Sequence, residues 1–80
     1  MIAWRPESAS VALVGVCDAE DASPLVELLL EYREAAIDLR ECERAHTSIV
    51  QLVLAARRPV AGPAGDAFLR RWVEPHLPAR

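Results

Sequence analysis

Hydrophobic residues recur along the chain with two periods, one typical of β-strands and one typical of α-helices. The clearest strand is a nearly continuous apolar run rich in β-branched residues, the pattern of a strand covered on both faces. Gly15 within that run indicates close packing against its backbone. A further strand is predicted where Ile37 and Leu39 alternate with Asp38. The predicted strands are Met1–Arg5, Val11–Val16, Ala35–Leu39 and a short edge strand around Val60.

The first predicted helix covers residues 25–34 and packs one side against the sheet. The polar residues before it include three candidate N-caps, Asp18, Asp21 and Ser23. The residues that share the sheet-facing side are Leu25, Leu28, Leu29 and Tyr32, with Val26 and Leu30 extending the apolar arc. The glutamates of this segment face water.

A polar turn over residues 40–45 leads into the second predicted helix, which ends before Pro59. Its apolar stripe is broad, so we expect this helix to be deeply buried. The stripe consists of Ile49, Leu52, Val53 and Ala56, widened by Val50 and Leu54. Thr47 and Ser48 therefore lie where a strand is followed by a helix N terminus. That position favours a capping hydroxyl and also a phosphate group.

A third helix, Ala67–Val73, is predicted to begin at Asp66 and to end near Pro75, leaving a frayed tail. The element order is then β-β-α-β-α-(β)-α. Strands that alternate with helices in this way predict an α/β fold, with a small, mainly parallel sheet covered by helices and an antiparallel first strand. At this length the chain is predicted to form one domain, residues 1–80.

Composition and charge narrow the possible functions. Apolar residues make up 52% of the chain, which favours a packed globule over disorder. Nine basic residues, all arginine, stand against twelve acidic ones, so the clustered basic excess of a nucleic-acid-binding protein is absent.

No apolar run reaches about 18 residues, which argues against insertion into a membrane. The N-terminal residues do not resemble a signal peptide, and we expect a cytoplasmic protein. Two cysteines are too few for a disulfide scaffold.

Three blocks of sequence, in this order, resemble a STAS domain, the fold of bacterial anti-sigma factor antagonists and of the cytoplasmic tails of sulfate transporters. The blocks are VALVGVCD at residues 11–18, AIDL at residues 36–39 and RAHTSIV at residues 44–50. The third block falls where the family typically has Asp-Ser-Ser/Thr-Gly-Leu. In this chain His46 replaces the usual Asp and Ile49 replaces the usual Gly. The resemblance covers residues 11–58 well and the remainder loosely.

The resemblance implies a non-enzymatic regulatory module that docks on an anti-sigma kinase or a related signalling kinase. Thr47 falls on the hydroxyl residue that the partner kinase phosphorylates in such antagonists, and Ser48 matches the second hydroxyl. The implied docking face comprises Asp18, Asp38, His46, Thr47 and Ser48. Alternatives are a phosphorylation-independent STAS adaptor and an accessory subunit of a lipid-transporter ATPase. A simpler interpretation is that Thr47 or Ser48 only caps the helix and that Asp38 is a solvated strand residue.

A contrasting hypothesis is a small enzyme or a metal site. Cys17 and Cys42 each follow a predicted strand, so they are expected at one edge of the sheet, near His46. Two sulfurs and one imidazole match no recognised metal-ligand spacing, and no glycine-rich cofactor motif is present. We therefore predict neither a cofactor nor a metal. Trp4 and Trp72 are large apolar residues near the two ends, and either one is a candidate for the core or for a homodimer contact.

Overall fold

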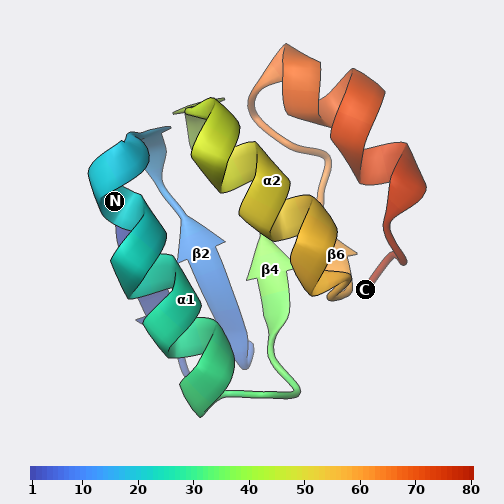
Figure 1. Ribbon diagram of the computed structural model, residues 1–80. Coiled ribbons are helices and arrows are strands. Elements are labelled where there is room, and N and C mark those ends of the chain that lie inside the picture. Colours follow the sequence, from blue (N-terminus) through green and yellow to red (C-terminus); the bar gives the residue numbers. More distant parts are fainter.

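The computed structural model describes all of residues 1–80 (Figure 1). They form six short strands and two α-helices, with the first helix after the third strand and the second helix after the fifth. The strands are β1 (Ile2–Arg5), β2 (Ser10–Leu13), β3 (Gly15–Cys17), β4 (Ala36–Asp38), β5 (Cys42–Ala45) and β6 (Val60–Ala61). The helices are α1 (Ala22–Glu31), which follows a 3₁₀ turn at Ala19–Asp21, and α2 (Thr47–Ala56). A C-terminal helical segment, residues 67–76, contains a π-helical stretch at Leu69–Val73 and a 3₁₀ turn at Glu74–His76.

The main sheet has the strand order β1-β2-β4-β6. Strand β1 pairs antiparallel with β2, whereas the pairs β2–β4 and β4–β6 are parallel. A second, two-stranded sheet is formed by the parallel pair β3–β5. The predicted α/β class, the mainly parallel sheet and the antiparallel first strand are confirmed.

The long predicted strand at 11–16 is broken at Val14 into β2 and β3. Gly15 causes the break because its φ of +66° is a left-handed conformation that only glycine adopts without strain. The predicted close packing at Gly15 is wrong, since a Cβ atom built there would meet nothing nearer than 3.8 Å. The close approach occurs instead at Gly65, where a Cβ atom would lie 2.7 Å from the carbonyl oxygen of Cys42.

Two predictions about irregular segments are also wrong. The expected polar turn at residues 40–45 contains strand β5, which pairs with β3 as the chain continues beyond the break at Val14. The expected frayed tail is held in place, because Val60 bridges to Ala79 and the guanidinium of Arg80 donates to the carbonyl oxygen of Ser8.

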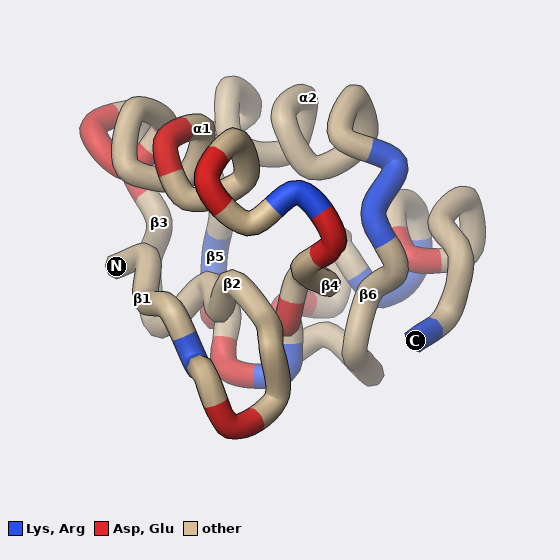
Figure 2. Tube along the Cα trace, turned by 90° about the horizontal axis from the view of Figure 1, so that it is seen from below, with Lys and Arg blue, Asp and Glu red and all other residues tan.

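Both α-helices cover the same face of the main sheet (Figures 1 and 2). Residues that alternate along β2 and β4, such as Val11 and Ile37, point toward these helices and pair in register. The helices contribute Leu25, Leu29, Ile49 and Val53, all buried in the core. Right-handed connections between parallel strands explain why α1 and α2 lie on one side.

Helix α2 is less buried than its broad apolar stripe predicted. Only Ile49 and Val53 are buried, and Leu54 is 38% exposed. On α1, Val26 and Leu30 likewise remain exposed rather than extending the core, at 36% and 60%. One layer of helices on one face of a small sheet cannot cover an apolar arc this wide, because the outer side of each helix has no neighbour.

The two tryptophans have different environments. Trp4 is half-buried and stacks on Tyr32, with 3.7 Å between ring centroids and planes 2° apart. Trp72 is 58% exposed on the C-terminal helical segment, with the Arg71 guanidinium 5.2 Å from its ring centroid. Trp4 therefore packs against α1, and Trp72 lies at the surface.

No helix of the protein has both the length and the apolar character needed to cross a bilayer.

Candidate functional site

Strands β3 and β5 end side by side, and the chain leaves both at the same edge. Cys17 pairs in register with Ala45, and the His46 N–H donates to the Cys17 carbonyl oxygen at 2.9 Å. Asp18 and His46 are therefore neighbours at the carboxyl ends of two parallel strands. Of the predicted docking residues, the structure brings together Asp18, His46, Thr47 and Ser48.

Asp18 is exposed and begins the 3₁₀ turn that precedes α1. Its backbone N–H donates to the Asp21 carboxylate at 2.9 Å, so these two predicted caps act as a reciprocal pair. The third candidate, Ser23, lies inside α1. The Asp18 carboxylate remains near the surface at the end of β3, where a partner can reach it.

His46, and neither Thr47 nor Ser48, is the N-cap of α2, so the predicted hydroxyl cap is wrong. The His46 backbone is extended, with φ −62° and ψ 153°, and its Nδ1 accepts the Ser48 N–H at 3.1 Å. The same Nδ1 lies 2.8 Å from the Ser48 hydroxyl. Because Nδ1 accepts the backbone N–H, this bond requires the neutral tautomer with its proton on Nε2.

Thr47 is the first residue of α2, and its side chain is exposed. Because His46 performs the capping, the Thr47 hydroxyl is not needed to satisfy the first turn. Beside it lies a hollow of about 270 Å³, lined by Ala45, Thr47, Val50 and Phe68. The sequence did not associate Phe68 with this site, because the contact joins segments that lie far apart along the chain.

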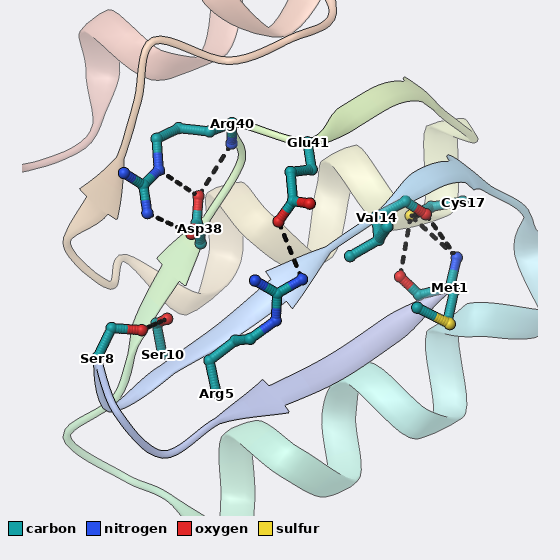
Figure 3. A network of polar contacts seen from close by, with 9 residues as sticks. All are labelled: Met1, Arg5, Ser8, Ser10, Val14, Cys17, Asp38, Arg40 and Glu41. Carbon is teal, nitrogen blue, oxygen red and sulfur yellow. Dashed lines mark hydrogen bonds and ion pairs between the residues drawn. The ribbon is translucent and has the colours of Figure 1, made fainter.

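Asp38 does not belong to this surface. Its residue is only 3% exposed, on the face of β4 opposite Ile37, and Arg40 binds it through three hydrogen bonds of 2.8–3.0 Å (Figure 3). These bonds from Arg40 lower the pKa of the Asp38 carboxyl. The predicted solvated strand residue is therefore a buried carboxylate, and it is bound within the fold by the exposed guanidinium of Arg40. On the same face, Arg5 pairs with Glu41 at 2.9 Å.

Cys17 and Cys42 are free thiols, both fully buried in the core. Burial, together with the neighbouring Cys17, raises the pKa of Cys42 to about 12. A protonated, enclosed thiol is a poor nucleophile and a poor metal ligand. The imidazole of His46 bonds to Ser48, and no three side chains of histidine, cysteine, aspartate or glutamate are grouped to hold a metal ion.

A shallow groove of about 680 Å³ lies on the other side of α2, between α2 and α1. Ser48 lines this groove, whereas Thr47 borders the hollow beside Phe68. The groove was not predicted from the sequence, because Val26 was expected to belong to the apolar arc of α1. The first turn of α2 thus borders two separate surfaces.

Comparison with protein-family models, with curated proteins and with solved structures gave no match. Assignment to a class of function therefore depends on the three sequence blocks and on the geometry at the start of α2.

Proposed function

We propose that this domain is a STAS-type regulatory interaction module that docks onto an anti-sigma kinase or a related signalling kinase. The docking face is the surface formed by Asp18, His46, Thr47 and Ser48, and the domain acts by binding rather than by catalysis. The observation that carries the proposal is the exposed Thr47 hydroxyl at the first position of α2, beside Asp18 at the ends of adjacent parallel strands.

The two departures from the family pattern are compatible with this role. Ile49, in place of the usual glycine, is fully buried in the core, so its side chain does not obstruct a partner at the surface. His46, in place of the usual aspartate, accepts the Ser48 N–H and so caps the helix as an aspartate would. The same contact engages the Ser48 hydroxyl. Thr47 is therefore the better phospho-acceptor of the two.

Phosphorylation of Thr47 would act through charge. A phosphate adds about −1.5 to −2 charges, and the N terminus of α2 would stabilise that charge. Asp18 and Thr47 follow the ends of the paired strands β3 and β5, so the phosphate adds to the negative charge of the exposed Asp18 carboxylate. A partner that fits the unmodified face then meets both a bulky group and electrostatic repulsion, and the complex dissociates.

The test is affinity purification from the native cell with wild type, Thr47→Glu and Thr47→Val as baits, read by mass spectrometry. Recovery of a signalling kinase by wild type and Thr47→Val, with loss in Thr47→Glu, supports the switch. Phosphopeptide mapping of the wild-type bait should place phosphate on Thr47 rather than Ser48. Equal recovery by all three baits would refute the phosphorylation switch and favour the phosphorylation-independent adaptor. Recovery of a transporter ATPase instead would refute the signalling role.

A further inference from the structure

The groove between α1 and α2 runs along both helices. The first part, about 680 Å³, is lined near the helix starts by Ala22, Ser23 and Ser48. It continues into a second hollow of about 270 Å³, lined by Leu30 and Ala56 near the helix ends. Each helix has ten residues, so the groove is about 15 Å long. That length matches about three turns of a third helix.

The groove is lined mainly by apolar side chains, some of which are small. Val26 and Leu30 are exposed on the α1 side, at 36% and 60%, although the core beneath is closed by Leu25 and Leu29. The opposite wall contains Leu52 together with the small residue Ala55. Small side chains allow another helix to approach closely, and exposed apolar ones then become its contacts. These side chains form an apolar surface along the two helices that the core does not use.

One acidic side chain, Glu27, lines the first part of the groove, whereas Arg58 lines the second hollow with its guanidinium bonded to backbone carbonyls. Glu27 and Glu31 are exposed on α1 at i, i+4 spacing, where like charges repel. The three ion pairs of the protein are Met1–Asp21, Arg5–Glu41 and Arg40–Asp38, so no cation pairs with these two glutamates. Figure 2 shows acidic residues along α1, whereas α2 is uncharged until its end. A cationic partner would relieve this repulsion.

We propose that the α1–α2 groove binds an amphipathic helix from another protein, with its apolar stripe on Val26, Leu30 and Leu52 and its arginines or lysines beside Glu27 and Glu31. This inference does not depend on phosphorylation of Thr47, because Thr47 borders the hollow beside Phe68, although the groove shares Ser48 with the proposed docking face.

Other occupants fit the groove less well. The chain's own basic and aromatic surface, Phe68, Arg71 and Trp72, lies on the C-terminal helical segment. A second copy docking through that surface would make a head-to-tail contact between two different patches, which yields rings or open chains rather than a twofold dimer. An anionic lipid surface would be repelled by Glu27 and Glu31.

The test uses three synthetic peptides of about 18 residues, long enough to form a helix on binding. They share one leucine stripe and carry arginine, glutamine or glutamate beside it. Fluorescence anisotropy gives Kd for each, and amide chemical shifts of the labelled domain locate the contact. The arginine peptide should bind at least about tenfold more tightly than the glutamine peptide, and the glutamate peptide more weakly still. Shifts should concentrate at Val26, Leu30, Leu52 and Ala55.

Two variants separate the contributions of shape and charge. Leu30→Ser, at a 60% exposed position, should keep the fold by circular dichroism and weaken the arginine peptide about tenfold without a change of charge. The double variant Glu27→Gln/Glu31→Gln should abolish the preference for arginine over glutamine. Its matched control, Glu7→Gln/Glu43→Gln, changes the same charge away from the groove and should keep that preference.

Three results would overturn the proposal. The first is equal affinity of the domain for all three peptides. The second is a set of shifts that maps away from α1 and α2. The third is concentration-dependent self-association in sedimentation that Leu30→Ser abolishes, because a second copy would then occupy the groove.

Discussion

Arg58 joins the C-terminal ends of the two helices, and its removal should destabilise the fold measurably. Its guanidinium donates to the carbonyl oxygens of Leu29 at 2.6 Å, Tyr32 at 2.9 Å and Ala35 at 3.0 Å. The Leu29 carbonyl is in the last turn of α1, where carbonyl groups have no intrahelical partner. One side chain therefore caps α1, neutralises the negative end of its dipole and ties it to the end of α2.

The magnitude follows from these bonds. A hydrogen bond to a charged donor contributes about 1.5–3 kcal/mol when buried, but Arg58 is half-exposed and water can replace part of the interaction. We therefore expect Arg58→Ala to lower the free energy of unfolding by about 2 kcal/mol. For a domain of this size that corresponds to a melting temperature lower by about 10 °C. Arg58→Lys should recover less than half, because an ammonium cannot present the planar fork of donors.

The assay is urea unfolding followed by circular dichroism, with thermal melts as a second measurement. Arg57→Ala is the matched control, because it removes the same charge from the neighbouring exposed residue. Arg57 has a left-handed backbone, with φ 51°, and its side chain makes no hydrogen bond or ion pair. If Arg58→Ala and Arg57→Ala differ by less than about 0.5 kcal/mol, the carbonyl contacts do not stabilise the protein as argued.

Other predictions test the cap, the glycines and the Asp38–Arg40 ion pair. His46→Ala should cost about 1 kcal/mol in urea unfolding, and His46→Asp should restore most of it, since aspartate also caps a helix. Gly65→Ala should lower the melting temperature more than Gly15→Ala. A Cβ atom at position 65 would lie 2.7 Å from a backbone oxygen, whereas an alanine at position 15 would only have to adopt a left-handed φ, which costs about 1 kcal/mol. Arg40 lowers the pKa of the Asp38 carboxyl in the folded protein. The stability that the ion pair contributes is therefore complete above the pKa of Asp38 in the unfolded chain, and it is lost as the pH falls through the pKa of Asp38 in the folded protein. Asp38→Asn should therefore lose less stability than wild type between pH 6 and pH 2, about two units either side of a typical carboxyl pKa.

The sequence predicted the order and class of the elements well, because most were specified by local patterns. The apolar run at Val11–Leu13 and the alternation at Ile37–Leu39 became β2 and β4, and α1 and α2 fall within two or three residues of their predicted ends. Strand β5 was missed because its sequence, CERA, contains two exposed charged residues and no alternating apolar face. Its pairing with β3 depends on the break at Val14, which separates β2 from β3 and directs β3 toward β5.

Part of the site was predicted from the sequence, and the wrong predictions about Asp38 and the helix cap have a common physical origin. Asp18, His46, Thr47 and Ser48 came together because the parallel strands β3 and β5 end at one edge, although β5 itself was not predicted. Asp38 was misplaced because strand alternation gives the face of a side chain but not what covers that face, and here Arg40 turns back over it. The cap was assigned to a hydroxyl by propensity, while the backbone turned one residue earlier and His46 took the position.

The two proposed surfaces meet at the first turn of α2, where they share Ser48 but not Thr47. Thr47 and Ser48 are consecutive, so their side chains diverge by about a quarter turn, one toward the Phe68 hollow and the other toward the α1 groove. Thr47 does not line the groove, whereas Glu27 does, so salt should screen the more distant charge at position 47. Thr47→Glu should therefore change the affinity of the arginine peptide by less than about threefold at physiological salt. A tenfold change would show instead that the two surfaces are one, and that phosphorylation regulates the groove itself.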